Sequence, residues 1–241
     1  MITNMKKSLK VTAIMATCGR HRCSERSLSL FLDQDYNNKH LLIYQNSQIQ
    51  QVLDSCIDTS IVTLINNHID NQTNLPYTSL GAIYNDAIKY IPADSDIITF
   101  WDDDDLFLED HISEGALGLT RGGKLAYKPA FSYFRSHNGL EIAQNVFEPS
   151  IFVKANYIKQ LGFSTTTTHQ HLQWLDPLIE NDSIFVDNEG KSTLIYNWGD
   201  SFETYKTSGH VLNPNHFDEY RVNSQDHGDL IISRVNIQEN L

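Results

Sequence analysis

A short run of β-prone residues, Ile-Ile-Thr-Phe-Trp at 97–101, leads directly into four consecutive aspartates at 102–105. A run of this length and composition favours a buried strand. In open α/β sheets, ligands gather just beyond the carboxyl ends of the strands. Four adjacent carboxylates repel one another unless a cation or wide solvation relieves them. The junction therefore predicts a ligand-binding edge in an α/β fold.

The four aspartates have two interpretations. In an extended segment alternate residues point the same way, so Asp102 and Asp104 would face one pocket while Asp103 points aside. Two carboxylates on a hard divalent ion are the usual arrangement for Mg²⁺ or Mn²⁺. The alternative is an acidic, solvated turn before a helix, with Asp105 or a neighbour as the N-cap.

Composition limits the class of protein. The 241-residue chain carries a net charge of -12, which argues against broad non-specific binding to nucleic acid or anionic membrane. Its three cysteines form no CxxC pair and indicate free thiols, so we expect a cytoplasmic protein. No run approaches the roughly 18 apolar residues of a membrane span. The apolar run at 11–16 is short and favours a first strand over a signal peptide.

The first hundred residues predict the order β-α-β-β-α-β. Strands are expected at 11–17, 41–44, 61–65 and 97–101, with a helix from a cap at Ser24 to about 35 and another, capped by Thr78 or Ser79, that ends before Pro92. Strands alternating with helices favour a mostly parallel sheet covered by helices. The expected fold class is therefore a single α/β domain.

The remaining chain predicts a smaller, mixed C-terminal part. Helices are expected at about 110–119, 155–161 and from 169 towards 180, with short strands at 125–127, 131–134, 150–153, 184–186 and 193–196. A glycine, Gly162, stands where the second of these helices should end.

Several motifs occur in a recognisable order. They are Thr17-Cys18-Gly19-Arg20 after the first strand, Asn46-Ser47 after the second, the helix holding Asn85, and Phe100-Trp101 before the aspartates. Together they resemble the family 2 glycosyltransferases, which have the GT-A fold. The resemblance covers residues 10–120 and continues less firmly through Glu148-Pro149-Ser150 to about residue 200.

The resemblance implies a reaction and roles for residues. A nucleoside diphosphate sugar would be the donor, a divalent metal (Mn²⁺ or Mg²⁺) would bridge its diphosphate and the Asp-x-Asp pair, and an acceptor hydroxyl would attack with inversion. Asp102 would lie near the sugar and ribose, and also serve the metal with Asp104. The remaining donor-binding residues would be Thr17, Arg20, Asn85 and Asp103. Residues 1–120 would form the donor half, and 121–241 the acceptor side and closing segment of the same domain.

Two positions depart from the family pattern. Asn46 stands where the family often has an aspartate that contacts the base of the nucleotide, so uridine is not implied. The usual Glu-Asp pair is replaced by Gln170-His171. His171 has an ordinary pKa close to working pH and is our candidate general base, with Asp176 as the alternative and a structural histidine as the other interpretation.

Two further residues have open interpretations. Trp174 stacks on a sugar or fills the core, and a lone tryptophan at helical spacing is more often a core residue. His210 falls where many GT-A enzymes place a late histidine that reaches the metal, but Gly-His in a polar loop is common.

The leading hypothesis is therefore a hexosyl- or pentosyltransferase. A nucleotidyltransferase and a degenerate nucleotide-sugar-binding module are the alternatives. A glycan, a small molecule, a protein or a hydroxymethylated DNA base are all open as acceptor, and the sequence does not predict an oligomeric state. A DNA acceptor needs a basic groove, for which there are five candidate residues that are otherwise scattered surface charges: Lys124, Lys128, Arg135, Lys154 and Lys159.

Overall fold

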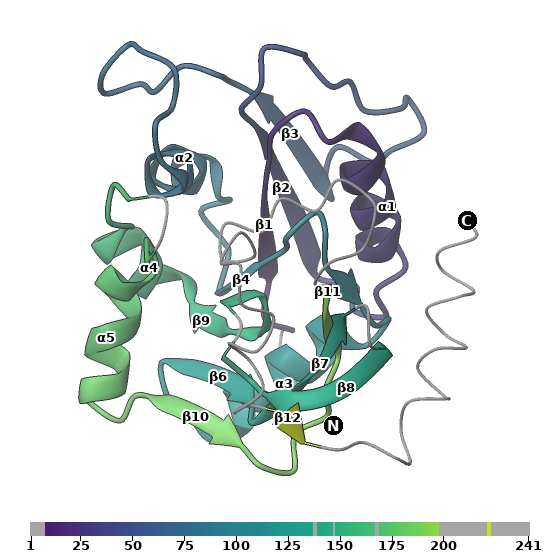
Figure 1. Cartoon of the computed structure of the whole chain (residues 1–241), viewed down its shortest axis with the longest axis vertical. Helices are drawn as coiled ribbons and strands as arrows, with labels where there is room; N and C mark the ends of the chain where they lie inside the picture. The colour runs from purple at the N-terminus through teal and green to yellow at the C-terminus, as the bar shows by residue number, and fades with distance from the viewer. Residues whose placement is uncertain (1–7, 137–138, 147, 167–168, 198–220, 223–241) are drawn as a thin grey trace, which may run out of the picture.

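The structure, a computed structural model, describes residues 8–136, 139–146, 148–166, 169–197 and 221–222. Within these residues the strands form two sheets, shown in Figure 1. The larger has the strand order β10-β6-β9-β4-β1-β2-β3. These strands are β1 (Val11–Thr17), β2 (Lys39–Gln45), β3 (Val62–Asn66), β4 (Ile97–Phe100), β6 (Ala126–Pro129), β9 (Phe152–Lys154) and β10 (Ile184–Asp187).

The larger sheet is mostly parallel. Strand β1 pairs in parallel with β2 on one side and β4 on the other, and β2 pairs in parallel with β3. Strand β9 runs antiparallel to both β4 and β6. The chain thus leaves β1 in one direction for β2 and β3, and later returns to its other side as β4. The carboxyl ends of β1 and β4 therefore form a topological switch point, where such sheets bind ligands.

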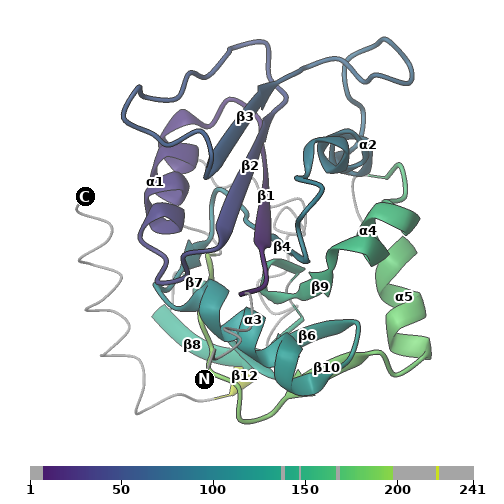
Figure 2. The same cartoon turned by 180° about the vertical axis from the view of Figure 1, so that it is seen from behind.

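Helices cover both faces of this sheet. Helices α1 (His21–Leu32) and α3 (His111–Gly122) pack on one face, and α2 (Leu80–Ala87), α4 (Ala155–Leu161) and α5 (Leu172–Glu180) on the other (Figures 1 and 2). Successive side chains of β1 point to opposite faces of the sheet. Ala13 and Met15 therefore pack in the apolar cluster on one face, and Ile14 packs in the cluster on the other. The predicted α/β class with a mostly parallel, helix-covered sheet is confirmed.

The second sheet has the order β12-β8-β7-β11-β5. Its strands are β5 (Leu106–Phe107), β7 (Phe131–Ser136), β8 (Gly139–Gln144), β11 (Leu194–Asn197) and β12 (Arg221–Val222). The sequence predicted β7 and β11 but not β5, which begins directly after the aspartates and pairs antiparallel with β11. The four aspartates thus connect one sheet to the other.

Several helix boundaries differ from the prediction. Helix α1 begins at His21 rather than after Ser24, because the Ser24 hydroxyl donates to the carbonyl oxygens of Arg20 and His21 instead of capping. Ser79 caps α2 as predicted, its side chain accepting from the Ala82 backbone N–H at 3.2 Å. Two single turns of 3₁₀ helix, η1 (Ile88–Tyr90) and η2 (Glu148–Ser150), were not predicted.

Both sheets draw strands from both sides of residue 120. β5 joins the later strands in the smaller sheet, and β6, β9 and β10 extend the larger one. Among the described helices, none combines the length and apolar character needed to cross a membrane.

Candidate active site

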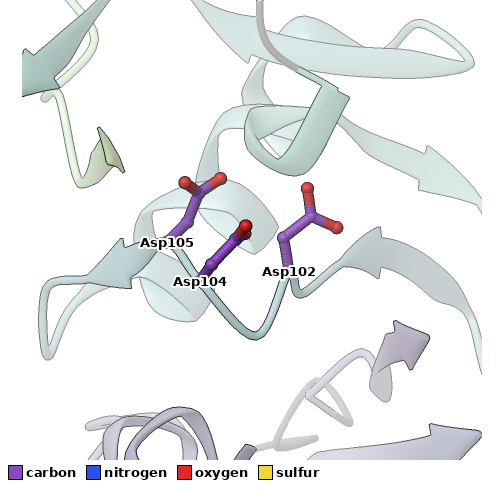
Figure 3. A group of neighbouring side chains, drawn as sticks. All are labelled: Asp102, Asp104 and Asp105. Carbon is purple, nitrogen blue, oxygen red and sulfur yellow. The ribbon is translucent and has the colours of Figure 1, made fainter. Parts of the chain in front are cut away.

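Residues 102–105 form a turn rather than an extended segment. The Asp105 backbone N–H points back to the carbonyl oxygen of Asp102, at 3.4 Å. Asp102, Asp104 and Asp105 each offer a carboxylate oxygen, and these oxygens lie within 4.8 Å of one another, on the same side of the turn in Figure 3. The extended geometry we predicted is wrong, because the turn adds Asp105 to the pair. The N-cap alternative for Asp105 is also wrong, because β5 separates it from α3.

Asp103 faces the protein interior. It is fully buried, it accepts a hydrogen bond from the Thr17 hydroxyl at 2.6 Å, and its other oxygen is paired with Arg20. Thr17 is itself only 1% exposed. Both residues were predicted to contact the donor, but the structure uses their polar groups to fasten the aspartate turn to the end of β1.

Arg20 bridges two of the aspartates. Its guanidinium pairs with Asp103 and lies 3.0 Å from Asp104 Oδ2. Burial disfavours its charge, but the neighbouring Asp103 and Asp104 carboxylates outweigh burial and raise the pKa of Arg20. Arg20 therefore carries a permanent positive charge that offsets part of the repulsion among the carboxylates.

The turn is also held from both sides. From α1, the Arg26 guanidinium donates to the Asp104 carbonyl oxygen at 3.3 Å. From the end of β11, the Asn197 backbone N–H donates to Asp105 Oδ1 at 2.9 Å, and its side-chain amide donates to the Asp104 carbonyl oxygen at 3.0 Å. The sequence placed Asn197 in a segment that closes over the donor but did not predict its contact with the aspartates, because only the pairing of β5 with β11 brings it here.

The three gathered carboxylates fit a hard divalent cation. Carboxylate oxygens are the ligands that Mg²⁺ and Mn²⁺ prefer, and three of them within 4.8 Å of one another can share one ion. Asp104 and Asp105 are buried, whereas Asp102 is partly exposed, so the group has an accessible side. His210, the other predicted metal ligand, lies outside the described residues.

The predicted base, His171, lies beside a glutamate that the sequence analysis gave no role. His171 Nδ1 is 3.2 Å from Glu148 Oε2, and the Gln170 side-chain amide donates to the same oxygen at 3.3 Å. Burial disfavours the charged imidazole, but Glu148 and, more weakly, Asp176 outweigh burial and raise the pKa of His171. Asp176, the alternative base, is exposed on α5.

Core contacts bring His171 towards the aspartate turn. Trp174, one helical turn after His171, is fully buried and stacks on Phe100 with ring centroids 5.5 Å apart. Phe100 precedes Asp102 by two residues, so this stack holds the start of α5 near the end of β4. Trp174 consequently has no exposed face on which a sugar could stack, and the core interpretation is the correct one.

The 3₁₀ turn η2 is held at the same end of the sheet. The Thr99 hydroxyl donates to the Pro149 carbonyl oxygen at 3.4 Å, which places Glu148 close to the end of β4. Burial, together with the nearby charges of Asp102 and Glu148, raises the pKa of Tyr84 well above its ordinary value. A tyrosine on α2 therefore lies close to both the aspartate turn and Glu148.

The last two predicted donor residues occupy different places. Asn85 makes a reciprocal pair with Phe163, donating to its carbonyl oxygen at 2.7 Å and accepting from its N–H at 2.8 Å. Its amide thus clamps the segment leading to His171 onto α2, rather than facing a ligand. Asn46 follows β2, where its backbone N–H donates to the Thr17 carbonyl oxygen at 2.9 Å and its side chain is half-buried.

The architecture is that of a GT-A-like glycosyltransferase fold. No protein-family model matches the sequence, and neither does any curated protein. Among solved structures, TarS 1-349 from S. aureus in complex with UDP-GlcNAc is similar, with a TM-score of 0.60 and 13% identity, over 88% of this chain and 64% of the TarS 1-349 chain.

A mannosyltransferase, PcManGT from Pyrobaculum calidifontis in complex with GDP-Man and Mn²⁺, is also similar. Its TM-score is 0.54 at 13% identity, over 81% of this chain and 58% of that protein. The chain thus spans less than two thirds of the length of these proteins. At this identity the comparisons establish the fold, and the activity requires its own argument.

Proposed function

We propose that this protein is a metal-dependent glycosyltransferase that moves a hexosyl or pentosyl group from a nucleoside diphosphate sugar to an acceptor hydroxyl. The observation that carries the proposal is the group of three carboxylates at the switch point of a GT-A-like sheet. The structural relatives support it, because they are solved with UDP-GlcNAc, or with GDP-Man and Mn²⁺.

The donor half is residues 1–120, which contain the whole aspartate turn. Asp102, Asp104 and Asp105 would hold the cation, Mn²⁺ or Mg²⁺, which when bound offsets the charge on the departing diphosphate. Arg20 keeps the metal-free carboxylates together, and its exposed fraction, about one fifth of the side chain, is available to the diphosphate. Asn46, half-buried at the end of β2, would contact the base of the nucleotide.

The acceptor side, within residues 121–241, supplies the base. His171 takes the proton of the acceptor hydroxyl as that oxygen forms a bond to the anomeric carbon. The bond from this carbon to the diphosphate oxygen breaks, and the diphosphate leaves with its electron pair. Attack from the opposite side gives inversion. Asp176 remains the alternative base, exposed on the same helix.

The acceptor is a hydroxyl compound of unassigned class. The five basic residues that a DNA acceptor would need are largely engaged elsewhere. Lys124 pairs with Asp182, Lys128 donates to the Asn145 carbonyl oxygen, and Lys159 donates to that of Pro92. These contacts favour a glycan, small molecule or protein acceptor over DNA.

A thermal-shift panel tests the proposal. Nucleoside diphosphates and sugar nucleotides are added with and without Mn²⁺ to the wild type, to Asp104→Ala and to the surface control Asp94→Asn. A ligand at one hundred times its Kd stabilises by about 2.7 kcal/mol. We expect a metal-dependent shift in the wild type and the control, and none in Asp104→Ala.

Product analysis separates the alternatives. Slow release of free sugar from the selected donor indicates glycosyl transfer to water, whereas a transferred nucleotide would indicate a nucleotidyltransferase. A metal-dependent thermal shift without any turnover of the sugar nucleotide would indicate a degenerate binding module. No shift with any compound would overturn the proposal.

A further inference from the structure

A polar cluster is made by Glu148, Gln170 and His171, none of which belongs to the three carboxylates that would hold the cation. We propose that Glu148 is a positioning residue that holds His171 in the tautomer with Nε2 as the basic nitrogen. This inference rests on the proposed function, in which His171 takes the acceptor proton.

The contacts of the Glu148 carboxylate with His171 and Gln170 indicate how it would position the imidazole. Its Oε2 lies 3.2 Å from His171 Nδ1 and accepts from the Gln170 amide at 3.3 Å. The two atoms lie at ion-pair distance but are not aligned as a hydrogen bond, so the carboxylate acts through its negative charge, which favours a proton on Nδ1 and leaves the lone pair on Nε2. Gln170 fixes the rotation of the carboxylate, and the His171 side chain retains about a quarter of its exposure, enough for a substrate to reach it.

Three separate elements hold this cluster in place. Glu148 belongs to η2, which the Thr99 hydroxyl ties to β4. The residues before His171 are docked on α2, where the Gly81 backbone N–H donates to the Thr166 carbonyl oxygen at 3.0 Å. A Cβ at Gly81 would come within 1.7 Å of the Ser164 carbonyl oxygen, so this close approach requires glycine. The cluster is therefore built into the fold rather than being a chance surface pair.

The electrostatics agree with the geometry. The charged groups facing His171 are Glu148 from η2 and Asp176 from α5 itself, and both raise the pKa of His171 against the effect of burial. Two tyrosines stand on the neighbouring helices, Tyr84 on α2 and Tyr157 on α4. Burial raises the pKa of each, so both remain neutral at working pH. The imidazolium formed on proton uptake is thus stabilised chiefly by Glu148.

The test uses two substitutions with different effects. Glu148→Gln removes the charge but keeps an acceptor oxygen, whereas Glu148→Ala removes both. Glu180→Gln is the matched control, because Glu180 is an exposed glutamate at the far end of α5, the helix that begins directly after His171. Heteronuclear NMR of the imidazole nitrogens reports the His171 tautomer and pKa without any need for turnover.

We expect Glu148→Gln to lower the pKa of His171 and to move the acid limb of the pH profile of donor hydrolysis to lower pH. Glu148→Ala should mix the two tautomers and lower kcat by at least about tenfold, since general base catalysis contributes 10²-fold or more. KM for the donor and the metal-dependent thermal shift should stay at wild-type values in both variants. A purely structural role would change stability and KM instead of the pH profile.

The inference is overturned if the tautomer and pKa of His171 in Glu148→Ala equal those of the wild type. Failure of the proposed function gives a different result. In that case the wild type turns over no sugar nucleotide, while the NMR difference between wild type and Glu148→Ala persists. The ion pair would then be real, and its assignment to catalysis would be wrong.

Discussion

Replacing Asp103 by alanine distinguishes the observed turn from the extended geometry that the sequence suggests. Asp103 is fully buried and binds Thr17 and Arg20. Removing one partner of a buried ion pair costs about 3–5 kcal/mol. The low end applies, because Arg20 keeps Asp104 at 3.0 Å and is partly exposed. The Thr17 hydroxyl, left without this acceptor, contributes about 1 kcal/mol or more to that loss.

We therefore expect Asp103→Ala to lose about 3 kcal/mol of unfolding free energy, measured by urea denaturation. For a chain of this size that corresponds to a Tm lower by roughly 6–12 °C. The Mn²⁺-dependent thermal shift should remain, since Asp102, Asp104 and Asp105 are intact. Asp105→Ala should lose that shift instead.

The control is Asp94→Ala, which removes a carboxylate paired with Lys10 at the surface. Exposed pairs contribute at most about 1 kcal/mol, so this variant should unfold like the wild type. A result of unchanged stability and a lost Mn²⁺ shift in Asp103→Ala would refute the turn geometry. Asp103 would then be a ligand rather than an internal anchor.

Two further predictions concern buried residues. Trp174→Ala should lose roughly 3–5 kcal/mol of stability in urea unfolding, whereas Trp174→Phe should lose much less; unchanged stability with weakened donor binding would restore the sugar-stacking role. Burial lowers the pKa of His111 to about 3, against about 6.5 in the unfolded chain. The unfolded state then binds the extra proton below pH 6.5, so stability is full above that pH and falls between 6.5 and 3. Relative to His111→Gln, the wild type should lose about 2 kcal/mol more between pH 7 and pH 5; parallel profiles would contradict this.

The sequence predicted the larger sheet well because its strands are apolar runs bounded by clear turn and cap residues. It also placed the acidic group at the correct strand end. It could not predict that 102–105 turn, because β5 is a two-residue strand that forms only when β11 pairs with it. The sequence left both the core and the sugar-stacking role open for Trp174, since its stack on Phe100 is a long-range contact.

Glu148 illustrates the same limit at the site itself. It lies 23 residues before His171 in the chain, in a single turn of 3₁₀ helix that periodicity cannot detect. Only the tie between Thr99 and Pro149 and the docking of the segment before His171 on α2 bring the two side chains together. The sequence therefore predicted the candidate base His171 but not Glu148, the residue that we infer sets its tautomer.

The aspartate turn has sheet on both sides, and this makes its length as important as its composition. On one side of the turn, the Trp101 backbone N–H donates a hydrogen bond to the Ile14 carbonyl oxygen of β1, in the larger sheet. On the other side, Leu106 pairs with Ile195 of β11, in the smaller sheet. Four residues must therefore bridge two sheets. A single inserted or deleted residue would slip β5 by one register and exchange the carboxylates that face inward and outward.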